Sequence, residues 1–226
     1  MKLLVDVGNT ALKLALYKND EITFISQHEV NWKDINQVLI ASVRSNQQLD
    51  NLISDANERG VEVISAKVSA ERNGISCAYQ QFHNLGIDRW LVVLAAAHLY
   101  AGQSAIIVDA GTATTVDVLV EGKIHQGGWI IPGIDLMMES ITSRAEKVFA
   151  SEQVSFENTV GINTPEALSY GCLAASLGLV AQARRLFGDN IRVLCTGGYG
   201  KLLSDHLENS EFIEDLVLRG LVAYAK

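Results

Sequence analysis

The sequence predicts an α/β protein made of two similar halves. An apolar, strand-like segment that ends in an aspartate and a glycine occurs twice, at Leu3–Thr10 (LLVDVGNT) and at Ala105–Asp117 (AIIVDAGTATTVD). After each copy the chain follows a comparable succession of short strands and helices, and no low-complexity segment separates the two. A buried strand that ends in a carboxylate and a glycine turn places an acid, backbone N–H groups and hydroxyls within reach of a phosphate. The repeat therefore predicts two phosphate-binding loops.

The first half reads as a three-stranded meander followed by alternating helices and strands. Apolar runs and turn residues predict strands at 2–7, 11–17, 21–28, 38–43 and 61–64, and a helix at 48–59 that stops at Gly60. The order β-β-β-α-β-α-β is that of a ribonuclease-H-like half-domain. We expect two such halves, residues 1–103 and 104–226, which face a central nucleotide cleft.

The second half begins again after an apolar helix at 90–100. Strands are predicted at 105–109, 115–120, 123–129, 191–196 and near 212–214, and helices at 134–146, 166–187 and 216–225. In Asn163-Thr164-Pro165 we expect Thr164 to be the N-cap and Pro165 the first helical residue. Trp129 fits a pocket wall or the core, and Gly197-Gly198 a plain turn or a close approach to an adenine.

The charge, the apolar runs and the cysteines of the chain make several classes of function less favoured. The formal net charge of −8 does not favour a nucleic-acid partner. The longest apolar run, Trp90–Ala97, is far shorter than the ~20 residues of a membrane span, and no signal-peptide pattern opens the chain. Cys77, Cys172 and Cys195 are odd in number and widely separated, which predicts reduced, buried thiols in a cytoplasmic protein.

Asp6 and Asp109 are the residues of the repeat whose side chains are best suited to bind a metal ion or a phosphate. A single Asp-Gly turn is most often only a turn, but two matched copies could hold Mg²⁺ through water and cradle phosphates. The chain has neither a Walker A loop nor a G-x-G-x-x-G motif. The five histidines show no metal-ligand spacing, and His98, on an apolar helix, is expected in the core or an interface.

Five short motifs, in order, resemble those of type III pantothenate kinases, members of the superfamily of acetate and sugar kinases, Hsp70 and actin. They are DVGNT with Lys13, GIDR at 86–89, DAGTATTVD at 109–117, GGWIIPG at 127–133 and NT at 163–164. The resemblance covers nearly the whole chain. It implies ATP-dependent phosphorylation of pantothenate, the first step of coenzyme A biosynthesis, with Mg²⁺, in a homodimer whose site lies at the subunit interface.

The resemblance also implies roles for individual residues. Asp88 is the family's proton acceptor, and Asp109 is similar to the ligand of a monovalent cation, K⁺ or NH₄⁺. The implied ATP contacts are Asp6, Val7, Gly8, Asn9, Thr10, Ala11, Leu12, Lys13 and Thr112. The implied pantothenate contacts are Tyr79, Gly86, Ile87, Asp88, Arg89 and Thr164.

General chemistry is compatible with these roles but leaves alternatives open. Phosphoryl transfer to an alcohol needs a proton acceptor, and Arg89 suits a substrate carboxylate through its planar fork. Without the resemblance, Asp88-Arg89 would be read as an ion pair at a helix start and Tyr79 as a packing aromatic. The alternatives for the whole chain are another small-molecule kinase of the superfamily, which a substrate panel would distinguish, or a non-catalytic regulatory accessory protein on the same fold.

Overall fold

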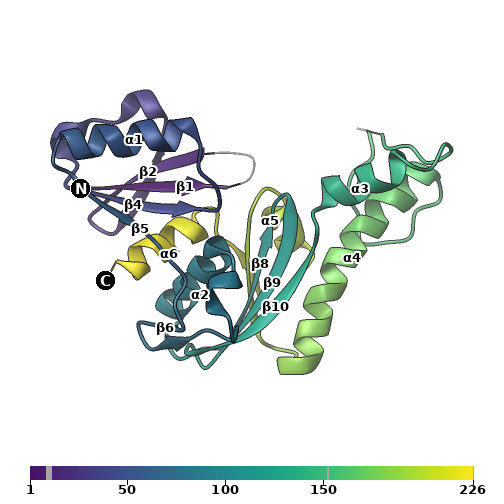
Figure 1. Cartoon of the computed structure of the whole chain (residues 1–226). Coiled ribbons are helices and arrows are strands. Elements are labelled where there is room, and N and C mark those ends of the chain that lie inside the picture. The colour runs from purple at the N-terminus through teal and green to yellow at the C-terminus, as the bar shows by residue number, and fades with distance from the viewer. Residues whose placement is uncertain (9–11, 152, 226) are drawn as a thin grey trace. The chain divides into compact units, whose positions relative to one another are not determined.

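The computed structural model describes residues 1–8, 12–151 and 153–225 of the chain. These residues form two compact units (Figure 1). The first consists of Met1–Gly102, Glu121–His125 and Asp215–Lys226, and the second of Gln103–Val120 and Gln126–Glu214. The C-terminal helix thus belongs to the first unit, whereas the sequence placed all of 104–226 in the second half.

Backbone packing explains why the last helix joins the first unit. Helix α6 (Leu216–Tyr224) packs against α2 (Ile87–Leu99) at Gly220. A Cβ atom at Gly220 would lie 2.1 Å from the carbonyl oxygen of Leu91, so only glycine permits this approach. The side chains of Arg72 and Asn73 also donate hydrogen bonds to the backbone of α6, at 2.6 and 2.7 Å.

The first unit contains a five-stranded sheet with the order β3-β2-β1-β4-β5. Its strands are β1 (Lys2–Val7), β2 (Leu12–Lys18), β3 (Glu21–Ile25), β4 (Gln37–Ser42) and β5 (Glu62–Ser65). Strands β1, β2 and β3 form the expected antiparallel meander, and β1, β4 and β5 are parallel. Asn19 and Asp20 turn between β2 and β3 with φ of 51° and 63°, the left-handed conformation that two-residue hairpin turns need.

Helices cover both faces of this sheet (Figure 1). Leu3, Val5 and Val7 of β1 pack against α1 (Gln47–Glu58) in one cluster. The opposite face contacts α2 and α6. Because successive strand residues point to opposite faces, Leu4 and Asp6 lie on the face that α2 and α6 cover.

The connection between β3 and β4 differs from the expected order. β3 ends at Ile25 rather than at residue 28, and no α-helix follows it. Two single 3₁₀ turns take its place, Gln27–Glu29 and Trp32–Asp34. The backbone N–H of Ser26 donates to the Glu29 carboxylate at 2.7 Å, so local side chains satisfy the turn and no apolar stripe extends it.

The second unit repeats the same strand order. Its strands are β8 (Ala105–Ala110), β9 (Ala113–Val120), β10 (Ile124–Pro132), β11 (Arg192–Thr196) and β12 (Ser210–Phe212), in the order β12-β11-β8-β9-β10, and the first two residues of β10 belong to the first unit. β8 pairs antiparallel with β9 and parallel with β11, as β1 does with β2 and β4. The predicted duplicated α/β architecture is therefore confirmed. Asp6 and Asp109 are each the fifth residue of the equivalent central strand.

The short elements between the two halves add a small hairpin. It consists of β6 (Glu71–Arg72) and β7 (Ile75–Ser76), and a 3₁₀ turn at Phe82–Asn84 follows. Ser76 pairs with Ile124, the first residue of β10.

Helix α4 (Thr164–Phe187) supports one face of the second sheet. Its buried residues Leu173, Leu177 and Val180 form a cluster with alternate residues of β8, β9 and β11, and Trp129 packs against that cluster. The N-cap is Asn163, whose side chain accepts the N–H of Glu166 at 3.0 Å, so the prediction that Thr164 is the N-cap was wrong. Gly188, with φ of 128°, ends the helix as expected.

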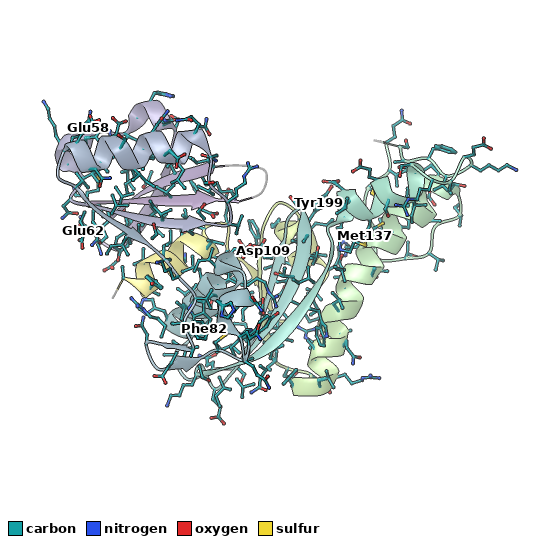
Figure 2. All side chains as sticks on the ribbon, viewed as in Figure 1. Glu58, Glu62, Phe82, Asp109, Met137 and Tyr199 are labelled. Atoms are coloured by element: carbon teal, nitrogen blue, oxygen red, sulfur yellow. The ribbon has the colours of Figure 1, made fainter. Side chains whose placement is uncertain are left out.

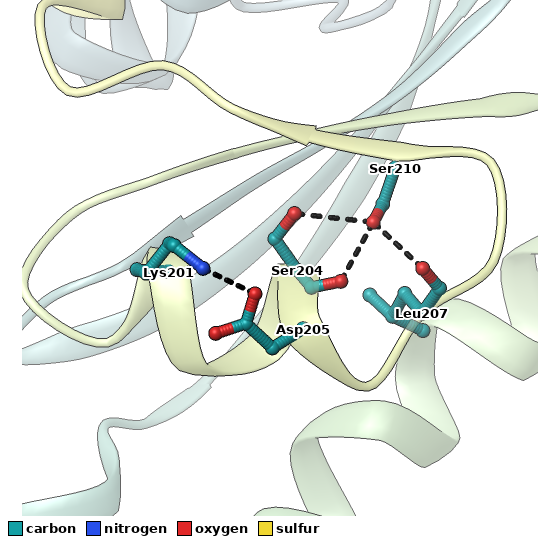
Figure 3. Close-up of polar contacts among 5 residues, drawn as sticks. All are labelled: Lys201, Ser204, Asp205, Leu207 and Ser210. Carbon is teal, nitrogen blue, oxygen red and sulfur yellow. Dashed lines mark hydrogen bonds and ion pairs between the residues drawn. The ribbon is translucent and has the colours of Figure 1, made fainter.

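Two shorter helices complete the second unit. Helix α3 (Ile134–Thr142) ends four residues earlier than predicted. Helix α5 (Gly200–Asp205) is tied to the start of β12 through Ser210, whose hydroxyl donates to the carbonyl oxygens of Ser204 and Leu207 at 2.8 and 2.7 Å (Figure 3). Lys201 and Asp205 form an ion pair one helical turn apart on α5 (Figure 3).

None of the helices in the described parts of the chain has the length and apolar character needed to cross a bilayer. Cys172 and Cys195 are buried and Cys77 is half-buried, and all three are free thiols.

Candidate functional site

Asp6 is a half-buried carboxylate at the end of β1. Its Cα is paired across the sheet with that of Lys13 on β2. Burial raises the pKa of Asp6 to about 6, Lys13 acts in the lowering direction, and the negative charge of Asp88 raises it further. Asp6 is therefore close enough to Lys13 and to Asp88 to be influenced by the charge of each.

The loop between β1 and β2 is only partly described. Asn9, Thr10 and Ala11 lie outside the described residues. Val7 is buried, whereas Lys13 is exposed and leaves its ammonium group available to an anion.

The N-terminus of α2 positions the G-x-D-R motif. Gly86 is the N-cap in an extended conformation, so the helix begins at Ile87 rather than at the expected residue 90. The Asp88 carboxylate accepts the backbone N–H of Arg89 at 2.8 Å. A Cβ at Gly86 would lie 2.4 Å from Asp88 Oδ1, so the glycine makes room for the carboxylate. Asp88 is half-buried, so part of its surface is exposed to solvent.

Arg89 and Tyr79 are brought together across ten residues of sequence. Arg89 is only 5% exposed, and its Nη1 donates to the Tyr79 hydroxyl at 3.0 Å. Its guanidinium carbon lies 5.7 Å from the centre of the Tyr79 ring. Buried charged groups are normally tied to partners, and a guanidinium held this way presents a fixed fork to a carboxylate.

In the second unit, Asp109 lies at the end of β8 (Figure 2). Ile106, Val108 and Ala110 point to the face packed on α4, so Asp109 points to the opposite face. Thr115 is its antiparallel partner in β9.

The second loop, Ala110–Thr112, is clamped by two glycines from later in the chain. A Cβ at Gly197, where φ is 86°, would lie 2.6 Å from both Asp109 Oδ1 and the carbonyl oxygen of Ala110. A Cβ at Gly133 would lie 2.1 Å from the carbonyl oxygen of Gly111, and the Gly133 N–H donates to Thr112 at 2.9 Å. Thr112 itself is exposed. The sequence was compatible with two roles for Gly197, a plain turn or a close approach to an adenine. In the structure Gly197 packs on this loop.

Tyr199 also holds the loop Ala110–Thr112 in place. Its N–H donates to the carbonyl oxygen of Ala110 at 2.9 Å, and its hydroxyl donates to the Asp135 carboxylate. Burial, and then the hydrogen bond to Asp135, raise the pKa of Tyr199 to about 12. Tyr199 and Met137 (both labelled in Figure 2) pack on one cluster with Ile134. No sequence motif marks Tyr199, and its place directly after Gly197-Gly198 is the one local signal for its role.

Thr164 and His98, two further residues considered from the sequence, are both exposed to solvent. Thr164 is exposed in the first turn of α4. His98 is exposed on α2 and so does not lie in the core, whereas its expected place in an interface stays a prediction.

Metal-binding groups are sparse. In residues 1–8, 12–151 and 153–225, no three His, Cys, Asp or Glu side chains are grouped so as to hold a metal ion. A cation bound there would thus rely on one or two carboxylates together with water and ligand oxygens, which is how Mg²⁺ is usually bound beside phosphates.

Solved structures of other proteins share this fold. A Campylobacter jejuni protein described as a Baf family transcriptional activator matches with a TM-score of 0.64 at 25% identity, over 97% of this chain and 95% of that one. A Sinorhizobium meliloti protein described as a 2-dehydro-3-deoxygalactonokinase matches with a TM-score of 0.57 at 13% identity, over 100% and 98%. The fold is that of the actin and sugar-kinase superfamily.

Sequence comparisons then give the family. Residues 22–185 match the family model of type III pantothenate kinase. The type III pantothenate kinase of Pseudoalteromonas translucida is 42% identical over 98% of this chain and 94% of its own length. That of Colwellia psychrerythraea is 32% identical over the full length of both. The chain belongs to the type III pantothenate kinase family.

The close approach at Gly197 predicts a sharp difference between neighbouring glycines. Gly197→Ala should lower the free energy of unfolding by about 2–4 kcal/mol, because it combines a left-handed backbone with a Cβ overlap. Gly198→Ala has nothing within 4 Å of its added Cβ and should change stability by less than about 0.5 kcal/mol. Urea unfolding measures both, and equal effects would contradict the proposed clamp.

The raised pKa of Asp6 predicts a pH-dependent effect of Asp6→Asn. The pKa of Asp6 is about 6 in the folded protein and 3.8 ordinarily, so the folded state binds the proton more tightly than the unfolded state does. Protonation of Asp6 therefore stabilises the folded protein fully below pH 3.8, and this stabilisation is lost as the pH rises through 6. Two pK units correspond to at most about 3 kcal/mol. Relative to wild type, the variant should therefore gain about 1–3 kcal/mol between pH 4 and pH 7.5 in urea unfolding. An identical difference at both pH values would show that Asp6 titrates normally.

Proposed function

We propose that this chain catalyses the ATP-dependent phosphorylation of pantothenate to 4'-phosphopantothenate, the first step of coenzyme A biosynthesis. Membership of the type III pantothenate kinase family supports the reaction and the substrate. The structural observation that carries the proposal is the position of Asp88, which lies at the start of α2 near Asp6 and Lys13. This arrangement combines an acceptor for a hydroxyl proton with an ammonium group for phosphate charge.

In this proposal Asp88 accepts the proton of the primary hydroxyl of pantothenate as that oxygen attacks the γ-phosphorus. A general base must reach the proton directly, and the half-buried carboxylate of Asp88 is accessible for this purpose. Arg89 binds the carboxylate of pantothenate in the orientation set by its bond to Tyr79. Gly86, Ile87 and Thr164 complete the substrate contacts.

The ATP phosphates take their contacts from two loops. The first is Asp6–Lys13, in which Lys13 supplies positive charge. The second contributes Thr112, whose exposed hydroxyl is presented by the loop that Gly133 and Gly197 hold. Mg²⁺ neutralises phosphate charge when bound, and Asp6 is the carboxylate suited to hold one of its water ligands.

Asp109 is proposed to bind the monovalent cation, K⁺ or NH₄⁺. Its carboxylate is half-buried and lies beside backbone carbonyl groups, including that of Ala110. Carboxylate and carbonyl oxygens are the ligands that such hard cations prefer.

We further propose a cytoplasmic homodimer that binds neither nucleic acid nor membranes. Four large apolar residues between 141 and 162 in the second unit are exposed, a feature typical of interaction surfaces. They are Ile141, Phe149, Val160 and Ile162. The three free thiols and the net charge of −8 support the remaining parts of the proposal.

The substrate assignment predicts strict dependence of turnover on pantothenate. ADP formation by the purified chain should require pantothenate, Mg²⁺ and K⁺ or NH₄⁺ together, and replacing K⁺ by Na⁺ should lower it. A panel of sugars and short acids serves as the control. ADP formation that continues without pantothenate, or that responds to another acceptor, would favour a different small-molecule kinase. A protein that binds ATP without any turnover would favour the regulatory alternative.

The base assignment predicts the effect of Asp88→Asn. The amide cannot accept the hydroxyl proton, so kcat should fall roughly 10²–10⁴-fold while the pantothenate KM changes little. Asp50→Asn is a matched control, because Asp50 is an exposed aspartate in the first turn of α1. Near-normal kcat in Asp88→Asn would return Asp88 to a purely structural role at the helix start.

A further inference from the structure

His125 is a buried imidazole at the second position of β10. It is only 1% exposed, although its neighbours Ile124 and Gln126 are exposed. It lies in the first unit and is not one of the motif residues that define the family resemblance.

The imidazole contacts the segment that carries Tyr79 in two ways. Its Nδ1 lies 3.5 Å from the backbone N–H of Ala78 and accepts a long hydrogen bond from it. Its ring stacks on that of Tyr79, with centroids 6.4 Å apart and planes inclined by only 11°. This segment has no regular secondary structure of its own, so side-chain contacts such as these contribute to its local order.

A third contact joins His125 to helix α2. Its ring centroid lies 6.4 Å from that of Trp90, at an interplanar angle of 56°. Trp90 follows Arg89 directly, and Arg89 donates to the hydroxyl of the same Tyr79. The imidazole therefore lies between the two elements that the Arg89–Tyr79 hydrogen bond connects.

We infer that His125 is a positioning residue for the carboxylate-binding site of the substrate. It holds the Tyr79 ring, and Tyr79 in turn fixes the direction of the Arg89 guanidinium. This inference rests on the proposed function, in which Arg89 binds the carboxylate of pantothenate. Because a planar guanidinium binds a carboxylate in a narrow range of orientations, a small rotation of Tyr79 weakens substrate binding without altering the reacting groups.

Two variants separate the two contacts of the imidazole. His125→Asn keeps an acceptor near the position of Nδ1 but removes the ring, and His125→Phe keeps the ring but removes the acceptor. Each should raise the pantothenate KM about tenfold, with kcat and the ATP KM within about twofold of wild type. His98→Asn, an exposed histidine of the same unit, should leave all three values unchanged.

A double-mutant cycle tests whether His125 acts through Tyr79. Tyr79→Phe removes only the hydroxyl that Arg89 uses, and should also raise the pantothenate KM. In the combined variant with His125→Asn the two effects should be less than multiplicative, because both disturb one chain of contacts. Thermal unfolding is followed for each variant, and KM is compared only at temperatures where each is folded.

The outcomes distinguish this inference from the proposed function. An unchanged pantothenate KM in folded His125 variants of an active enzyme would overturn the positioning role alone. Equal changes of both KM values, a fall in kcat, or fully multiplicative effects with Tyr79→Phe would also overturn it. Wild-type protein without pantothenate-dependent turnover would instead contradict the proposed function.

Discussion

The structure of the candidate site depends on one geometric constraint, the two-residue alternation at the end of a central strand. Strand β1 packs Leu3, Val5 and Val7 against α1. Asp6 must therefore point to the opposite face of the sheet, which α2 and α6 cover. That placement buries part of its carboxylate and raises its pKa to about 6. The positive charge of Lys13 lowers this pKa and so offsets part of the free-energy cost of burying the Asp6 carboxylate. The same alternation in β8 directs Asp109 away from α4.

Helix α2 connects this constraint to the proposed substrate site. Its apolar body is packed by α6 at Gly220, and its N-terminus carries Asp88 and Arg89. A carboxylate destabilised by burial is common at functional sites, where a group is kept for chemistry at a cost in stability. Tyr79 and Arg89 show the complementary arrangement, because a buried cation is held in place by a defined partner.

The sequence predicted the strands and the duplication well, because apolar runs and Asp-Gly turns are local signals. It failed where local signals compete or where partners are distant. Asn163 and Thr164 are both good N-caps, and in the structure the side chain of Asn163 accepts the capping hydrogen bond. The membership of α6 in the first unit depends on Gly220 meeting Leu91, and the contact of His125 with Ala78 joins residues 47 positions apart. No periodicity or short motif encodes such contacts.

The proposed function depends most on the role of Asp88 as the base that accepts the hydroxyl proton of pantothenate. A crystal structure with a non-hydrolysable ATP analogue, Mg²⁺ and pantothenate tests it most directly. We expect an Asp88 carboxylate oxygen within about 2.6–3.2 Å of the pantothenate hydroxyl, with the γ-phosphate beyond that hydroxyl and the carboxylate of pantothenate on Arg89. Pantothenate bound away from Asp88, or its hydroxyl facing another carboxylate, would contradict the account.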